Sequence, residues 1–193
     1  MEIQTIPSFP LTKGRAHDVC GAGASFFAFA LAGQVGGSIL WVREAWQSEL
    51  INPAGFAEIL DPRALLVATA KDQTEVLAVA EEALRSGAVS VVVMELSKPM
   101  SLTAGRRLQL AARDGKSTAL GIIPEGMGSN AAETRWQCDP VFDPSDSTLQ
   151  RWTLTKNKSG TLGGWYVRWD ATSRRLAMVS PAGQRTGSAG APD

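Results

Sequence analysis

The sequence predicts an α/β protein, with a mostly parallel sheet that is flanked by helices and ends in antiparallel strands at its C-terminal end. Three observations predict this architecture. Apolar runs with strand character alternate with helical segments up to Pro124, which is the order of strand–helix–strand units. The run SVVVME at 90–95 is almost continuously apolar, as expected for a central strand covered on both faces. Beyond Pro124, short strands separated by turns replace this alternation.

Each element of the first part has a local signal. Helices are expected at 24–35, 54–59, 71–86 and 102–114. The first is apolar throughout and ends at Gly36, the second follows the turn at Asn52, and the last two carry apolar residues on one face. Short apolar runs bounded by turn residues predict strands at 16–20, 38–42, 65–68, 90–95 and 117–123.

The last third of the chain has a different character. Strands are expected at 134–138, 149–156 and 164–169, between turns rich in Asp, Pro, Ser and Gly. A flexible loop is expected at 125–132. The chain is therefore divided into an N-terminal arm at 1–15, a core domain at 16–180 and a small, polar tail at 181–193 that is predicted to be disordered.

Composition excludes several classes of protein. The 193 residues suffice for one sizeable domain, and the net charge of +0 provides no overall attraction to nucleic acid or membrane. No apolar run reaches the ~18 residues of a membrane span, and the N-terminus lacks the core of a signal peptide. Cys20 and Cys138 are far apart, and His17 is the single histidine. A cytoplasmic protein without a metal site or cofactor is therefore expected.

The turn after the first strand has the layout of a phosphate-binding loop. A working loop reads G-x-x-x-x-G-K-[ST], where the lysine contacts phosphate and the hydroxyl binds magnesium. If Gly21 is the first glycine, Phe26, Phe27 and Ala28 occupy the glycine, lysine and hydroxyl positions. Phenylalanine offers phosphate neither charge nor donor. The predicted degenerate loop comprises Gly21, Gly23, Ser25, Phe26, Phe27 and Ala28, and no catalytic residue is assigned.

Colinear segments of the chain carry a family resemblance. They are LDPRALLV at 60–67, LRSGAVSVVVME at 84–95, LTAGRRLQLAA at 102–112, AETRW at 132–136 and KNK at 156–158. In this order they resemble the core of the RecA recombinase family, and most closely its ImuA-like mutagenesis proteins, from about residue 15 to about residue 180. The resemblance implies a RecA-like fold, and it places Glu95 as a vestigial Walker B acid; a strand-end carboxylate near a loop is the alternative interpretation of that residue.

The resemblance also implies a function. It is that of a non-catalytic accessory in SOS-response, DNA-damage-induced mutagenesis, a form of DNA repair by translesion synthesis. The implied partners are ImuB, an error-prone DnaE-type polymerase and RecA itself, and a homo-oligomer is compatible with them. The stretch Ile3 to Leu11 of the arm is a candidate interface, since RecA-type cores join their neighbours through an N-terminal segment.

Basic and aromatic residues near the late strands form a second candidate site. If they cluster on one face, they contact DNA phosphates or a partner, with a tryptophan stacking on a base. The candidate residues are Arg106, Arg107, Arg135, Trp136, Arg151, Lys156 and Lys158. Because acids balance these charges, weak or indirect DNA binding is expected.

Other interpretations remain open at this point. Gly21, Gly23 and Phe26 partly match a dinucleotide fingerprint, with Glu44 about 20 residues further on, but a tight strand-to-helix turn of small residues is the preferred interpretation. His17 is interpreted as a hydrogen-bonded strand-end residue. The chain also resembles SulA, a division inhibitor that binds FtsZ and has a RecA core without a working phosphate loop. A weak nucleotide-binding ATPase is the third alternative.

Overall fold

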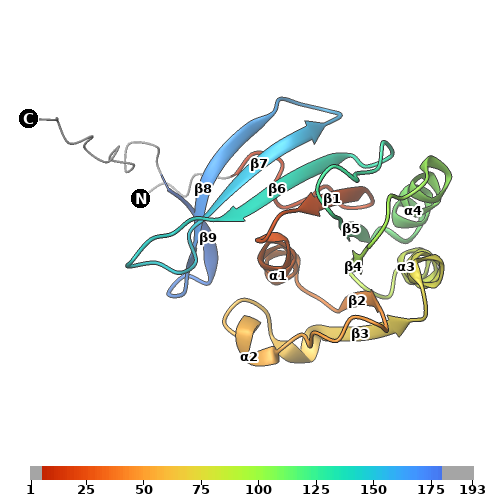
Figure 1. The fold of residues 1–193 in the computed structure, drawn as a ribbon, viewed down its shortest axis with the longest axis horizontal. Coiled ribbons are helices and arrows are strands. Elements are labelled where there is room, and N and C mark those ends of the chain that lie inside the picture. Colours follow the sequence, from red (N-terminus) through yellow and green to blue (C-terminus); the bar gives the residue numbers. More distant parts are fainter. Residues whose placement is uncertain (1–5, 180–193) are drawn as a thin grey trace, which may run out of the picture.

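The computed structural model describes residues 6–179; residues 1–5 of the predicted arm and the predicted tail at 181–193 lie outside this range. In the described residues one nine-stranded sheet has the order β3-β2-β4-β5-β1-β6-β7-β8-β9 (Figure 1). Its strands are β1 (Ala16–Cys20), β2 (Ile39–Glu44), β3 (Leu65–Ala70), β4 (Val91–Glu95), β5 (Thr118–Ile122), β6 (Thr134–Pro140), β7 (Gln150–Asn157), β8 (Gly163–Asp170) and β9 (Arg175–Val179).

The helices are α1 (Ala24–Val35), α2 (Pro53–Phe56), α3 (Gln73–Ser86) and α4 (Leu102–Gly115), with a short 3₁₀ helix η1 (Pro62–Ala64). From β3 to β6 the neighbouring strands run parallel, and β7, β8 and β9 continue the sheet antiparallel. The predicted fold class, a mostly parallel sheet flanked by helices with antiparallel strands at the C-terminal end, is therefore confirmed.

Several element boundaries differ from the prediction. The strand expected at 38–42 runs on to Glu44, since Arg43 and Glu44 are buried with partners and so continue the strand. The helix expected at 54–59 ends at Phe56, and the next residues form hydrogen-bonded turns. β9 is not among the predicted strands, although Leu176 and Met178 alternate toward the core.

The two outer helices begin and end where local chemistry predicts. Asp72 and Ser101 accept hydrogen bonds from backbone amides in the first turns of α3 and α4, which satisfies donors that a helix start leaves unpaired. Gly87 ends α3 in the left-handed conformation at φ 66°, where a side chain would be strained. α3 and α4 then pack against each other on one face of the sheet (Figure 1).

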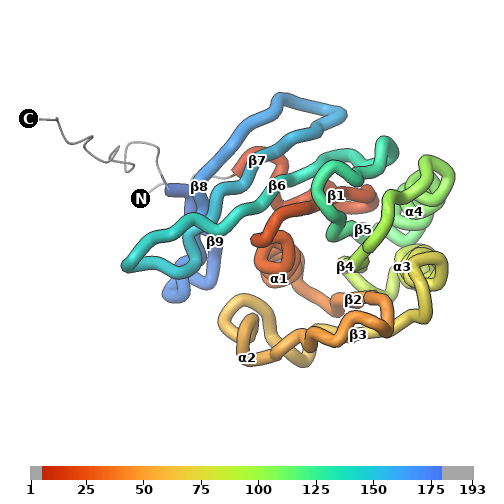
Figure 2. The backbone as a smooth tube through the Cα atoms, viewed as in Figure 1, coloured from red at the N-terminus to blue at the C-terminus, as the bar shows by residue number. Residues whose placement is uncertain are grey.

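α1 lies on the opposite face, and the sheet curls around it so that the late strands lie over it (Figure 2). Phe27 is 0% exposed. Its ring centroid lies 4.6 Å from that of Trp152, 5.4 Å from that of Trp136 and 5.3 Å from that of Phe9. The apolar residues all around α1 are thus explained, because both halves of the sheet and the N-terminal segment cover the helix.

The described part of the N-terminal arm packs against this domain. Ile6, Phe9 and Leu11 are buried in the core cluster that contains α1. Their side chains therefore stabilise this chain, and an interface over the stretch 3–11 would have to use other atoms of the arm. No helix within residues 6–179 has both the length and the apolar character that crossing a membrane requires.

His17 takes part in a buried chain of hydrogen bonds, which agrees with its interpretation as a hydrogen-bonded structural residue. Its Nε2 lies 3.1 Å from the carbonyl oxygen of Thr12 and its Nδ1 lies 2.7 Å from Oγ1 of Thr134. Thr134 Oγ1 also accepts a hydrogen bond from the indole of Trp136. Because a carbonyl can only accept, the neutral ring donates through Nε2 and accepts through Nδ1. Burial lowers the pKa of His17 to about 4.

We predict that Phe27→Ala destabilises the domain by about 3–5 kcal/mol, because it removes a fully buried ring and leaves a cavity. Urea unfolding followed by tryptophan fluorescence measures the change. Phe142→Ala is the matched control, since Phe142 is 91% exposed and its loss should cost less than about 0.5 kcal/mol. A Phe27→Ala protein as stable as the control would show that α1 is packed differently.

We also predict that protonation of His17 lowers the stability of the folded protein as the pH falls. Since the folded pKa of His17, about 4, lies below its ordinary value of 6.5, the unfolded chain binds the proton first as pH falls. Stability should therefore decrease by about 3 kcal/mol between those two values. Unfolding free energies measured across this range should fall less steeply in His17→Gln than in the unsubstituted protein. Parallel pH profiles for the two proteins would contradict this assignment.

Candidate functional site

The loop that joins β1 to α1 is packed against β6. Gly21 has φ +91°, and a Cβ on Gly21 or Gly23 would collide with the Cys138 carbonyl oxygen or with side chains of β6 and β7. The amide of Gly23 donates to that carbonyl at 2.8 Å. The two glycines of the predicted phosphate loop therefore permit a close approach between the loop and the antiparallel half of the sheet.

The residues at the glycine, lysine and hydroxyl positions of the predicted phosphate loop pack in the interior of the protein. Phe27 and Ala28 are completely buried, and Phe26 contacts Trp152 edge-on at 6.5 Å between ring centroids. The first turn of α1 is closed by a hydrogen bond from the amide of Phe27 to the carbonyl of Gly23. The predicted loop residues therefore lie together, but of the six only Ser25 lines the pocket described below.

Glu95 lies at the carboxyl end of β4 and is bound by two side chains from β2. Its Oε1 accepts the indole N–H of Trp41 at 2.6 Å, and its Oε2 lies 3.0 Å from the guanidinium of Arg43. Arg43 also donates to the Gln47 side chain and to the backbone carbonyl of Glu49. The carboxylate predicted to be a vestigial Walker B acid is thus neutralised by a buried arginine.

Glu44, the acid considered as a ribose ligand, takes no part in the ion pair between Arg43 and Glu95. It is buried at the end of β2, and its Oε2 accepts a hydrogen bond from the Ser97 hydroxyl at 2.6 Å. The structure therefore gives no support to the dinucleotide interpretation of Gly21, Gly23 and Phe26. Within residues 6–179, no group of three or more His, Cys, Asp or Glu side chains could hold a metal ion.

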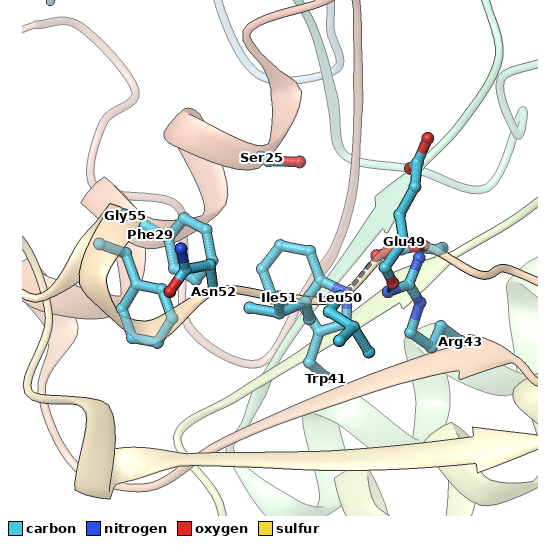
Figure 3. A pocket seen from close by; sticks show the side chains of 11 residues that line it. Ser25, Phe29, Trp41, Arg43, Glu49, Leu50, Ile51, Asn52 and Gly55 are labelled. Atoms are coloured by element: carbon cyan, nitrogen blue, oxygen red, sulfur yellow. Dashed lines mark hydrogen bonds and ion pairs between the residues drawn. The ribbon is translucent and has the colours of Figure 1, made fainter.

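A pocket of about 290 Å³ opens at this edge of the sheet. Figure 3 shows Phe29 and Trp41 along its length, Arg43 at one end and Ser25 above them. The Phe29 ring stacks on Phe56 at 4.4 Å and on Trp41 at 5.0 Å between centroids. The pocket therefore offers aromatic walls, an ion pair whose charges cancel and the acidic residue Glu49. This lining suits an apolar or aromatic group better than a phosphate.

Sequence reasoning missed this pocket because its walls come from separate segments. Ser25 and Phe29 lie on α1, Trp41 and Arg43 lie on β2, Glu95 ends β4, and the remaining lining lies between 49 and 56. A local signal existed in the run ILWVRE, where an arginine and a glutamate follow directly on a buried strand. Leu50, which lines the pocket, is almost fully exposed, and Trp46 is mostly exposed on the same loop.

The predicted basic cluster divides into separate parts. Arg135, Lys156 and Lys158 meet at the loop 129–131, whose carbonyl oxygens accept their hydrogen bonds. Arg107 is instead bound to Glu81 at 2.7 Å. Arg151 lies in register with Asp139, toward the opposite end of β7 from Lys156.

Arg106 faces Lys158 across a second groove, between α4 and the loop 129–131. The prediction that Trp136 stacks on a base or a partner is wrong, because that residue is 0% exposed, and Trp152 is equally buried. Successive side chains of a strand point to opposite faces of the sheet. Both tryptophans lie on the face that covers α1, which explains why they are buried.

Asp18 connects the basic loop to the parallel half of the sheet. Its Oδ2 accepts the Ser129 amide at 2.8 Å and lies 3.3 Å from the guanidinium of Arg135. Burial raises the pKa of this carboxyl, and the hydrogen bond from Ser129 and the charge of Arg135 oppose that rise. The loop 129–131 is thus held from two sides, by a buried acid and by basic side chains.

Comparison with known proteins places the chain in a family. No family model matches it. It is 32% identical to Protein ImuA of Caulobacter vibrioides strain NA1000 / CB15N, over 84% of this chain and 78% of that protein. Protein ImuA of Caulobacter vibrioides strain ATCC 19089 / CIP 103742 / CB 15 gives the same values. Since the similarity extends over most of both proteins, the chain belongs to the ImuA family.

Proposed function

We propose that this protein is a non-catalytic accessory in DNA-damage-induced mutagenesis. It acts in the cytoplasm through contacts with ImuB and an error-prone DnaE-type polymerase during translesion synthesis, as part of an SOS response. Contacts with RecA are a further element of the proposal. Membership of the ImuA family supports the process, and the partners are those that the resemblance to ImuA-like proteins implies.

The burial of Phe27 carries the non-catalytic part of the proposal. This residue occupies the lysine position of the phosphate loop and is 0% exposed among aromatic rings. A phosphoryl-transfer site needs a cation on the phosphates and a magnesium ligand beside it. Here Ala28 replaces the hydroxyl and Arg43 already binds Glu95. These positions stabilise the fold, which favours a role in binding partners.

We predict that deletion of the gene lowers the damage-induced mutation frequency to the uninduced level, because the polymerase would lose an accessory that it requires. Mutation to drug resistance after ultraviolet irradiation measures the frequency, and a plasmid copy should restore it. An unchanged frequency in the deletion strain would contradict the proposal. Cell filamentation on overexpression would then favour the alternative of a SulA-like inhibitor of FtsZ.

We predict that the purified protein neither binds nor hydrolyses ATP at millimolar concentration, since no lysine reaches the phosphate position. Titration calorimetry and phosphate release measure the two properties, each against a working P-loop ATPase as the positive control. Phosphate release above that of a heat-inactivated sample would contradict the non-catalytic assignment. It would leave the proposed role in mutagenesis to be judged by the genetic test.

A further inference from the structure

The solvent-facing side of α4 carries two leucines that are not covered in this structure. Leu102 is 46% exposed and Leu110 is 48% exposed. Arg106 lies midway between them, so the three residues follow each other at intervals of four and form one stripe along the helix. The opposite face of α4, with Leu108, is buried. The packing of α4 against the rest of the domain therefore does not bury this stripe.

A fixed wall faces this stripe across a groove of about 330 Å³. The groove is lined by Leu102, Arg106, Gln109 and Leu110 of α4 on one side and by Asn130, Ala131 and Lys158 on the other. A Cβ on Gly105 would meet Ser129 Oγ at 2.5 Å and Ala131 Cβ at 2.9 Å, so the loop lies directly on the helix. Because Asp18 and Lys156 hold that loop through its backbone, the groove is formed before any partner arrives.

The groove is positively charged. Its lining includes Arg106 and Lys158 and no acidic side chain from the described part of the chain. Ion pairs within residues 6–179 use neither of these cations. Burial, followed by the charges of Arg135 and Lys158, lowers the pKa of the adjacent Lys156, against the opposing effect of Asp18 and Glu133. Positive charge is therefore in excess here.

We infer that this groove binds an acidic amphipathic helix of a partner protein. Leu102 and Leu110 are separated by about 12 Å along α4, so a partner helix would place apolar side chains about two turns apart between them. Asp or Glu residues beside those side chains would pair with Arg106 and Lys158. Helix-in-groove recognition uses this combination of an apolar stripe and complementary charge. The inference rests on the partner-binding role proposed above.

Two other occupants fit the groove less well. A nucleic-acid backbone would place charged phosphates against the two exposed leucines of the groove. A second copy of the same groove would bring like charges together across a two-fold axis, which is unfavourable. The exposed leucines and the excess positive charge together select an occupant that is both apolar and acidic.

The test uses the full-length protein and fluorescein-labelled synthetic peptides of about 15 residues, long enough to form a helix on binding. One peptide carries leucines two turns apart with glutamates beside them, a second has lysine in place of glutamate, and a third is a scrambled form of the first. Fluorescence anisotropy should show binding of the glutamate peptide alone, with an affinity that falls as salt rises. Equal binding of the lysine or scrambled peptide would overturn the inference.

Two matched variants locate the site. Arg106→Glu should weaken binding of the glutamate peptide by about tenfold or more and strengthen binding of the lysine peptide. Arg151→Glu has the same change of charge on an exposed residue of β7 outside the groove, and it should leave both affinities within about twofold. Equal effects of the two variants would overturn the assignment of the groove. Circular dichroism and thermal unfolding verify that both variants are folded.

Two further measurements separate this inference from its alternatives and from the proposed function. Displacement of the glutamate peptide by a single-stranded oligonucleotide, abolished by Arg106→Glu, would overturn the inference in favour of nucleic acid. Concentration-dependent dimerisation that Leu110→Ser removes would overturn it in favour of a second copy. If Arg106→Glu and Leu110→Ser both restore induced mutagenesis in the deletion strain as well as the unsubstituted gene does, the groove inference fails while the proposed function stands.

Discussion

The structure depends on the enclosure of one apolar helix, α1, by a sheet that curls around it. Phe27 lies among Phe9, Trp136 and Trp152, and the helix can occupy this position only if the preceding loop passes close to β6. Gly21 and Gly23 make that approach possible. The two glycines that make the loop resemble a phosphate-binding loop are thus required by the close packing of the loop against β6. A lysine in place of Phe27 would bury an unpaired charge among aromatic rings, which would strongly destabilise the folded state.

A buried ion pair lies beside the enclosed helix, at the carboxyl ends of β2 and β4. There Arg43 and Glu95 neutralise each other, and Trp41 and Phe29 form apolar walls beside them. An ion pair in that position keeps two charges satisfied next to a buried strand, which a single glutamate could not do. The edge of a parallel sheet where ligands commonly bind therefore holds a pocket with aromatic walls.

Much of the fold could be predicted because its signals are local. The bounds of β1 and α1 were predicted from a buried strand, a turn of small residues and an apolar helix, and all of these lie within 20 consecutive residues. The candidate sites were harder to predict, because the exposure of a side chain depends on which face of the sheet it lies on and on pairing between distant segments. Trp136 is buried because it faces α1, and Arg107 is neutralised by Glu81 of another helix. The pairing of Arg43 with Glu95 likewise becomes evident only when β2 and β4 are known to be neighbours.

The basic residues show how a cluster of charges can serve the fold and still leave a functional surface. Lys156 and Lys158 donate to backbone carbonyls in 129–131, and those neutral acceptors order the loop without cancelling the two lysine charges. The ordered loop lies on α4 at Gly105 and so creates a wall opposite the exposed leucines. Interactions that fix the junction between the antiparallel strands and α4 thereby also produce a preformed, positively charged groove. Since a rigid surface loses little entropy on binding, this junction is better suited to partner recognition than the enclosed loop before α1.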